Sequence, residues 1–164
     1  RVVVAGGSAG GGLAAGLALL TRDRSGPAIA GLHLSYPMLD DRESPMITSE
    51  LADTVVWNAR LDALAWEAYL GGSPADQYAA PGRAADLSGL PRTVIDAGDL
   101  DLFVHEDVAF ASALEAAGVE VTLTVEAGAP PCFEFILPDT DRSRVTLERK
   151  HAAIAGLLDG GAAR

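Results

Sequence analysis

Residues 6–10 read Gly-x-Ser-x-Gly, a pattern that usually displays a catalytic serine. The motif stands between a short apolar run and a stretch of small, helix-forming residues. A strand that turns sharply into a helix holds the central serine in a strained turn, and only small residues fit around it. The Ser8 hydroxyl is then displayed as a nucleophile. The backbone N–H of Ala9 points to where an oxyanion would form during acyl transfer.

Three other interpretations of this glycine run are weaker. Gly10, Gly12 and Ala15 have the G-x-G-x-x-A spacing of a dinucleotide-binding turn, but they begin well after the apolar strand has ended. A phosphate-binding loop would need a Lys-Ser or Lys-Thr pair after the glycines, and none stands there. Glycines between a strand and a helix can also serve close packing alone. Because the motif follows the strand directly, we favour the nucleophile.

Composition indicates one folded domain and argues against several kinds of partner. The 164 residues are 49% hydrophobic, which is ample for a core. Twelve basic and 23 acidic residues give a formal charge of −11, which repels nucleic-acid phosphates and anionic lipid surfaces. We therefore expect no nucleic-acid partner.

The cysteine content and the hydropathy of the sequence argue against a disulfide-bonded protein, a metalloprotein and a membrane-spanning protein. The single cysteine, Cys132, excludes an internal disulfide, and we find no metal-ligand spacing. We expect neither a metal nor a cofactor. No apolar stretch reaches the roughly 18 residues of a membrane span, and no signal peptide precedes the first strand. These features predict a soluble, cytoplasmic protein.

The hydrophobic pattern predicts an α/β fold in which strands and helices alternate. The expected strands cover residues 2–5, 29–36, 93–97 and 119–125, and the expected helices cover residues 9–20, 51–70, 106–117 and 142–158. Such an order builds a parallel sheet through right-handed crossovers. The loop 36–50 leaves the carboxyl end of a strand, where loops usually line a site. No linker is evident, so residues 1–164 are expected to form a single domain.

Several blocks of the sequence resemble the hormone-sensitive-lipase-like branch of the α/β-hydrolases, also called α/β hydrolase fold-3. In chain order the blocks are GGSAGGGLAAGLALL, SYPMLDDR, WEAYLGG, DLSGLPRTVIDAGDLDLF, HEDVAFASALEAAGVEVTL and EAGAPPCFEFILP. The resemblance covers essentially the whole chain. It implies a carboxylic-ester hydrolase that forms an acyl-enzyme on a serine and takes small-molecule esters.

The resemblance places the acid of a catalytic triad at Asp101. This residue follows the expected strand 93–97, in the segment DAGDLDLF. A carboxylate there would accept an imidazole N–H and orient the catalytic base. Its neighbours Asp96 and Asp99 are expected to cap turns or to carry solvated charge.

The third triad member departs from the family pattern. In the family a histidine follows a Gly-Ala-Pro-like turn and precedes a Gly-Phe pair, whereas this chain has Pro131 and Cys132 at those positions. A proline ring can neither accept nor return a proton. Loss of one triad member leaves only residual catalysis, so the resemblance predicts an impaired enzyme.

The remaining histidines do not replace the missing base. We expect His33 to be a buried structural residue within the strand 29–36. His105 would open a helix, and His151 would lie on a solvated face of the last helix.

The family's segments that precede the elbow are also absent from this chain. In the family a His-Gly-Gly-Gly type loop on an earlier strand supplies further oxyanion donors, whereas this chain begins at the elbow strand. We therefore expect a partial α/β-hydrolase domain of about four strands with crossover helices and without the N-terminal strands. The strand 2–5 would form an open sheet edge, which invites pairing with a second copy or with a missing N-terminal half.

Two functional hypotheses follow from these residues. The first is a carboxylic-ester hydrolase with a Ser8 nucleophile, impaired because Pro131 replaces the histidine. The alternative is a non-catalytic α/β-hydrolase-like protein that keeps the fold and serves binding or interaction.

Overall fold

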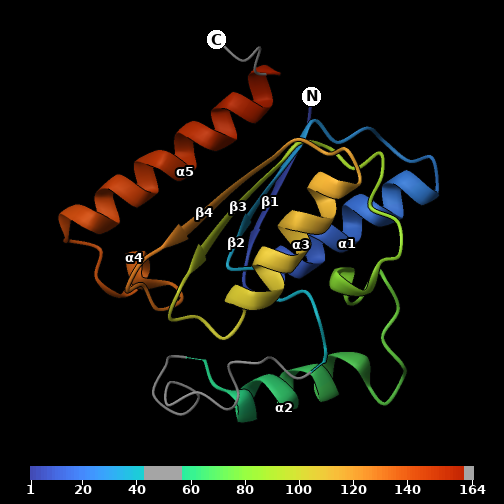
Figure 1. Ribbon diagram of the computed structural model, residues 1–164, viewed down its shortest axis with the longest axis horizontal. Coiled ribbons are helices and arrows are strands. Elements are labelled where there is room, and N and C mark those ends of the chain that lie inside the picture. The colour runs from blue at the N-terminus through green and yellow to red at the C-terminus, as the bar shows by residue number, and fades with distance from the viewer. Residues whose placement is uncertain (43–56, 161–164) are drawn as a thin grey trace.

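A parallel sheet forms the centre of the molecule (Figure 1). The computed structural model describes residues 1–42 and 57–160. Within them the sheet has four strands in the order β1-β2-β3-β4, namely β1 (Val3–Gly7), β2 (Gly31–Ser35), β3 (Thr93–Gly98) and β4 (Val121–Glu126). The four predicted strands and their parallel arrangement are confirmed.

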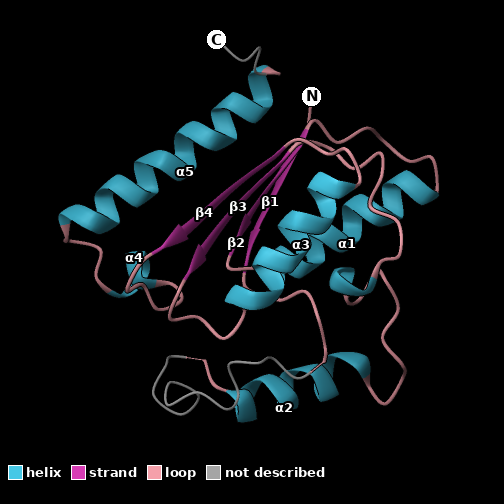
Figure 2. Ribbon diagram, viewed as in Figure 1, coloured by secondary structure: helices cyan, strands magenta, loops and turns pink. Residues whose placement is uncertain are grey.

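Helices cover both faces of this sheet (Figure 2). They are α1 (Ala9–Asp23), α2 (Ala59–Leu70), the 3₁₀ turn η2 (Pro81–Arg83), α3 (Val104–Ala116), α4 (Phe133–Ile136) and α5 (Asp141–Asp159). Helices α1 and α3 lie on one face of the sheet, and α5 lies on the other. This is the arrangement that right-handed crossovers between parallel strands produce.

The four predicted helices are present, with one corrected boundary. Part of the expected helix 51–70, and most of the loop 36–50, lie outside the described residues. Helix α2 begins at Ala59, because the Asn58 side chain accepts a hydrogen bond from the Leu61 N–H at 3.0 Å and so caps the first turn. Helix α4 and η2 were not predicted. Both are too short for a hydrophobic periodicity to reveal them.

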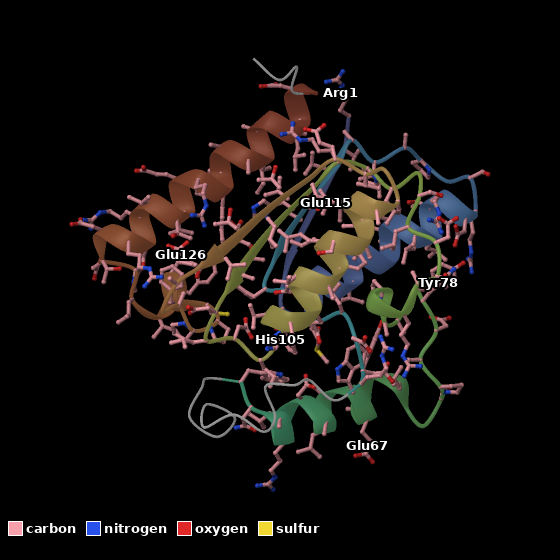
Figure 3. All side chains as sticks on the ribbon, viewed as in Figure 1. Arg1, Glu67, Tyr78, His105, Glu115 and Glu126 are labelled. Atoms are coloured by element: carbon pink, nitrogen blue, oxygen red, sulfur yellow. The ribbon has the colours of Figure 1, made fainter. Side chains whose placement is uncertain are left out.

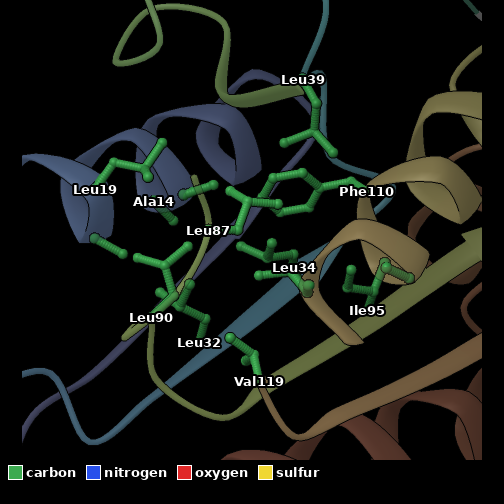
Figure 4. Packing of buried hydrophobic residues seen from close by; sticks show 14 residues of the cluster. Ala14, Leu19, Leu32, Leu34, Leu39, Leu87, Leu90, Ile95, Phe110 and Val119 are labelled. Atoms are coloured by element: carbon green, nitrogen blue, oxygen red, sulfur yellow. The ribbon is translucent and has the colours of Figure 1, made fainter. Parts of the chain in front are cut away.

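The hydrophobic core lies between the sheet and the helices α1 and α3 (Figure 4). One row of the sheet runs from Gly6 through Leu34 and Ile95 to Leu123 in register. Leu34 and Ile95 are fully buried, as expected for central strands covered on both faces. The small residues of helix α1 allow it to lie close to the segment that follows β2. A Cβ on Gly12 would lie 2.1 Å from the Met38 carbonyl oxygen.

Strand β1 is an edge of the sheet among the described residues, because only β2 pairs with it. Two of its residues, Ala5 and Gly7, are exposed. Helix α1, which packs against β1 and β2, exposes Leu13 and Leu17 at 56% and 43%. The predicted open edge is therefore present in the described part of the fold.

The two ends of the described chain meet at the amino ends of the strands. The Arg1 guanidinium donates to the Leu158 carbonyl oxygen near the end of α5 at 3.3 Å. The carboxyl ends of the strands point to the opposite side of the molecule (Figure 1). None of the described helices is both long enough and apolar enough to cross a membrane.

Candidate active site

The nucleophile elbow has the strained geometry that its sequence predicts. Ser8 sits between β1 and α1 with φ 54° and ψ −126°, a conformation that non-glycine residues rarely adopt. Its backbone N–H donates to the Ser35 carbonyl oxygen at 3.0 Å, and its own carbonyl oxygen accepts from the Met38 N–H at 3.0 Å. A Cβ on Gly6 would lie 2.1 Å from the Gly10 carbonyl oxygen, so this position requires glycine.

Helix α1 begins directly after the serine. Ala9 is its first residue, so the Ala9 N–H belongs to the first turn, where N–H groups have no intrahelical acceptor. Such N–H groups carry the positive end of the helix dipole. The elbow can therefore offer a hydroxyl and a favourable environment for negative charge at adjacent residues.

Asp101 is a fully buried carboxyl in the loop between β3 and α3. Its Oδ1 accepts a hydrogen bond from the Phe103 N–H at 3.1 Å. Its Oδ2 is buried and has no hydrogen-bond partner in residues 1–42 and 57–160. Burial raises the pKa of Asp101 to about 6, although the backbone N–H groups of Phe103 and Leu102 favour the charged form. One carboxyl oxygen thus remains available to an N–H donor.

The turn that follows β4 carries Pro131 and Cys132. Pro131 is buried, and Cys132 has φ 59° and ψ 19°, the left-handed conformation that glycine adopts most easily. Burial raises the pKa of the Cys132 thiol, and the carboxylates of Glu134 and Asp101 raise it further. Leu100, which precedes Asp101, donates its backbone N–H to the Ala129 carbonyl oxygen of this turn at 3.1 Å. The structure brings the elbow, Asp101 and the Pro131 turn to the carboxyl ends of β1, β3 and β4.

The two other aspartates of the DAGDLDLF segment have different roles. Asp99 caps the turn after β4, where its Oδ1 accepts from the N–H groups of Gly128 and Ala129 at 2.6 and 3.3 Å. The expected capping role of Asp99 is confirmed. For Asp96 the expectation of a turn cap or a solvated charge is wrong. This residue is buried, and its carboxylate oxygens lie 3.0 Å from His33 Nε2 and 3.0 Å from an Arg149 guanidinium nitrogen.

The three histidines occupy the positions in the fold that the sequence predicts. His33 is 3% exposed in β2 and is held against Asp96, as expected of a structural residue. His105 is exposed in the first turn of α3 (Figure 3). His151 is exposed on α5. Position 131 holds proline, so no histidine stands in the turn 128–132 after β4.

Two acidic residues of α3 were not predicted to belong near the site. Glu106 Oε1 accepts from the Leu39 N–H at 2.6 Å, and burial raises the pKa of Glu106 to about 8. Asp107 is fully buried, and neither of its oxygens has a hydrogen-bond partner among the described residues. Burial, with the charges of Glu106 and Asp101, raises the pKa of Asp107 well above its ordinary value. In sequence both resemble solvated charges of a first helical turn, which favours acidic residues.

An apolar cavity of about 130 Å³ opens beside the elbow. Its lining comes from the first turns of α1, from α2 and from the segments after β2 and before η2. The lining residues are Ala9, Gly12, Leu13, Met38, Ala65, Trp66, Tyr69 and Ala79. Ala9 follows Ser8, and Met38 donates its N–H to the Ser8 carbonyl oxygen, so the cavity adjoins Ser8. Among the described residues, no group of three or more His, Cys, Asp or Glu side chains is placed to hold a metal ion.

A strained serine between a parallel strand and a helix, with a buried acid after another strand of the same sheet, is typical of an α/β-hydrolase site. Comparison with known families agrees with this geometry. Residues 1–135 match the family described as alpha/beta hydrolase fold, and the chain belongs to that family. Its relatives identify the branch as that of the hormone-sensitive-lipase-like carboxylesterases, so the predicted family and fold are confirmed.

Two curated relatives come from Mycobacterium tuberculosis. Carboxylesterase NlhH is 37% identical over 134 residues, which cover 77% of this chain and 41% of NlhH. Esterase LipI is 37% identical over 127 residues, which cover 74% of this chain and 39% of LipI. The chain therefore spans about two fifths of the length of these relatives.

Solved structures of similar proteins are also esterases. Esterase LipW from Mycobacterium marinum superposes with a TM-score of 0.91 at 35% identity, over 96% of this chain and 50% of LipW. A bacterial heroin esterase superposes with a TM-score of 0.84 at 33% identity, over 98% of this chain and 51% of that protein. The four-stranded fold described above thus corresponds to about half of a family member.

Proposed function

We propose that this chain is the elbow-bearing part of a carboxylic-ester hydrolase whose catalysis is impaired by the loss of its general base. The observation that carries the proposal is the Ser8 elbow, strained at φ 54° and joined to β2 through its backbone. An ordinary tight turn would not need this conformation, whereas display of a nucleophile does. The esterase relatives support the same reaction class.

The proposed chemistry is an acyl transfer to Ser8. The Oγ atom attacks the ester carbonyl carbon, the carbonyl oxygen becomes an oxyanion, and the Ala9 N–H helps to stabilise it. The alcohol then leaves, and water hydrolyses the acyl-enzyme to a carboxylic acid. Each half-reaction needs a base to take a proton and return it to the leaving group. In this chain Asp101 is the group that would orient such a base.

Position 131 is the point at which this mechanism fails. A histidine there could donate its ring N–H toward Oδ2 of Asp101, which has no hydrogen-bond partner among the described residues, and accept the proton of Ser8. Proline offers neither function. Without the base, catalysis is expected to fall to the residual level that oxyanion stabilisation and binding provide, some 10³- to 10⁴-fold above the uncatalysed reaction.

The apolar cavity beside the elbow would receive the acyl group. Its 130 Å³ is close to the roughly 150 Å³ of an engineered apolar cavity that accommodates benzene. We therefore propose short-chain esters as substrates, with the acyl chain against Trp66 and Tyr69. The formal charge of −11 favours neutral esters over anionic ones.

We also propose a cytoplasmic location for the protein.

A second candidate function rests on Pro131 itself. The Pro131 ring is buried in the turn, so the fold accommodates a residue that cannot act as a base at this position. A non-catalytic relative that binds an ester or another protein would retain the elbow as part of its fold.

One experiment separates the two functions. The purified chain, its Ser8→Ala variant and its Pro131→His variant are treated with a fluorophosphonate probe and with p-nitrophenyl butyrate. We expect weak labelling of the parent chain, none of Ser8→Ala, and at least a tenfold gain for Pro131→His, since a histidine restores the missing proton transfer. A parallel set is co-expressed with the half of esterase LipW that this chain does not cover.

Each outcome of that experiment decides something. Turnover by the parent chain far above Ser8→Ala contradicts the impairment. No labelling of Pro131→His in either set contradicts the hydrolase proposal and favours the binding protein. If Pro131→His is active, p-nitrophenyl octanoate should be a much poorer substrate than the butyrate. Equal rates on both esters would exclude the cavity as the acyl site.

A further inference from the structure

Three buried polar side chains meet next to the turn that contains Pro131. Glu134 of α4 is 1% exposed, and its Oε1 accepts a hydrogen bond from the Tyr36 hydroxyl at 3.2 Å. The same oxygen pairs with the ammonium group of Lys150 on α5, which is 7% exposed. The Lys150 Nζ also lies 4.7 Å from the centre of the Tyr36 ring. A buried carboxylate is thus neutralised by a buried ammonium that also stacks on an aromatic ring.

This network joins two residues with strained backbones. Tyr36 has φ 40° and Cys132 has φ 59°, and both are non-glycine residues in the left-handed region. Glu134, which accepts the hydrogen bond of the Tyr36 hydroxyl, lies in the first turn of α4, directly after Cys132 and Phe133. Such conformations persist only where the surrounding structure holds them. The contacts of Glu134 and Lys150 supply that restraint from two other elements.

The network also reaches the nucleophile elbow. The Tyr36 ring covers Gly7, where an added Cβ would lie 3.3 Å from the Tyr36 Cε2 atom. Gly7 immediately precedes Ser8, and Ser8 in turn donates its N–H to the residue before Tyr36. Tyr36 therefore lies between the elbow and the turn after β4. Helix α4 and the start of α5 continue from that turn, as Figure 1 shows.

We propose that Glu134, Lys150 and Tyr36 are positioning residues that lock the turn 128–132 against the nucleophile elbow. Helix α5 would then set the place of residue 131 through Lys150, although neither lysine nor glutamate touches the reacting atoms. The catalytic meaning of this lock rests on the proposed function, because only a hydrolase needs residue 131 at a fixed distance from Ser8. The mechanical lock itself does not depend on activity.

Cys132 provides a direct test, because it is the only cysteine of the chain and lies within the locked turn. Cys132 is half-buried, and its reaction with a thiol reagent such as 5,5′-dithiobis-(2-nitrobenzoate) becomes faster as the thiol becomes more accessible. We expect Tyr36→Phe and the double variant Glu134→Gln/Lys150→Met to accelerate native-state labelling by about tenfold or more, since both release the turn. Arg144→Met is the matched control, because Arg144 is also a cation of α5 but pairs at the surface with Asp141.

Two results would overturn the lock. One is labelling of Tyr36→Phe and of the double variant within twofold of the parent chain. The other is acceleration that global unfolding fully explains, which urea titrations followed by tryptophan fluorescence would reveal. Tyr36→Phe removes one hydroxyl and keeps the ring over Gly7, so it decides the matter if the double variant does not fold.

A second measurement connects the lock to catalysis. In the Pro131→His background, Tyr36→Phe should lower kcat several-fold with little change in KM, because it displaces a base rather than a binding contact. If Pro131→His is inactive, the proposed function fails while the thiol measurement still decides the lock. If Pro131→His is active and Tyr36→Phe leaves kcat unchanged, the turn needs no such support.

Discussion

Glu106 accepts a hydrogen bond from the backbone N–H of Leu39, with 2.6 Å between Oε1 and the nitrogen. The preceding residue, Met38, donates its own N–H to the Ser8 carbonyl oxygen. Helix α3 is therefore connected to the nucleophile elbow through two consecutive backbone groups. This connection explains why the acidic side chain of Glu106 is half-buried in the first turn of a helix.

We expect that removing the hydrogen-bond acceptor of Glu106 lowers the free energy of unfolding, whereas replacing its carboxyl with an uncharged amide does not. Burial raises the pKa of Glu106 to about 8, so the carboxyl is largely neutral at pH 7. We expect Glu106→Ala to lose about 1–3 kcal/mol of unfolding free energy, because the Leu39 N–H is left unsatisfied. Glu106→Gln keeps an acceptor and should stay within about 0.5 kcal/mol of the parent chain. Urea titrations at pH 7 measure both, and equal losses would contradict the role of this bond.

The buried acids predict that the chain loses stability as the pH rises. In the unfolded chain these groups ionise near their ordinary values of 3.8 for Asp101 and Asp107 and 4.5 for Glu106. In the folded chain the raised pKa values keep them protonated to higher pH. Above about pH 4 the unfolded state therefore releases protons first, and the free energy of unfolding falls by up to about 1.4 kcal/mol per pH unit for each group. The fall for a group ends at its pKa in the folded chain, about 6 for Asp101 and about 8 for Glu106.

The variant Asp107→Asn tests this dependence. Asparagine cannot ionise, so the variant should gain stability relative to the parent chain at pH 8 and gain little at pH 4. Urea midpoints measured at both pH values give the comparison, and His105→Gln, an exposed neighbour on the same helix, serves as the control. A parent chain that is more stable at pH 8 than at pH 5 would show that these acids are not held neutral.

The two outer glycines of the elbow should respond in opposite ways to an added methyl group. A Cβ on Gly6 would meet the Gly10 carbonyl oxygen at 2.1 Å, whereas a Cβ on Gly10 would have no atom within 4 Å. We expect Gly6→Ala to lose more than about 3 kcal/mol or to fail to fold. Gly10→Ala lies in a helix and should gain up to about 1 kcal/mol. Thermal unfolding measures both, and similar melting temperatures would contradict the elbow geometry.

The open edge of β1 predicts self-association. Ala5 and Gly7 are exposed on a strand that has one neighbour in the described fold, and such edges pair readily with another chain. We expect the isolated chain to elute as a dimer or larger species in size-exclusion chromatography. Ala5→Lys should shift it toward the monomer, because a charged edge opposes pairing. A parent chain that is monomeric at high concentration would refute the edge prediction.

Features that depend on nearby residues were predicted well from the sequence. The four strands followed from apolar runs, and the elbow at Ser8 followed from a motif whose glycines are a steric requirement. The turn around Pro131 was located by resemblance, and the left-handed backbone of Cys132 suits a position that is usually glycine.

Features that depend on distant partners were not predictable. Asp96 looks like a turn residue in sequence, but its partner Arg149 lies 53 positions away on α5. Asp107 occupies a helix position that normally favours solvated acids, and only the packing of α3 buries it. The link between Glu134 and Tyr36 spans 98 positions, and no local pattern indicates it.

The contact between Arg1 and the Leu158 carbonyl brings both ends of the described chain to the side of the sheet opposite the elbow. An affinity tag, a surface anchor or a fluorescent label joined near Arg1 or beyond α5 would therefore extend away from Ser8. The protein can be immobilised from that side with Ser8, Cys132 and the apolar cavity facing the solution. Labelling of the serine and of the thiol can then be followed on the same immobilised sample.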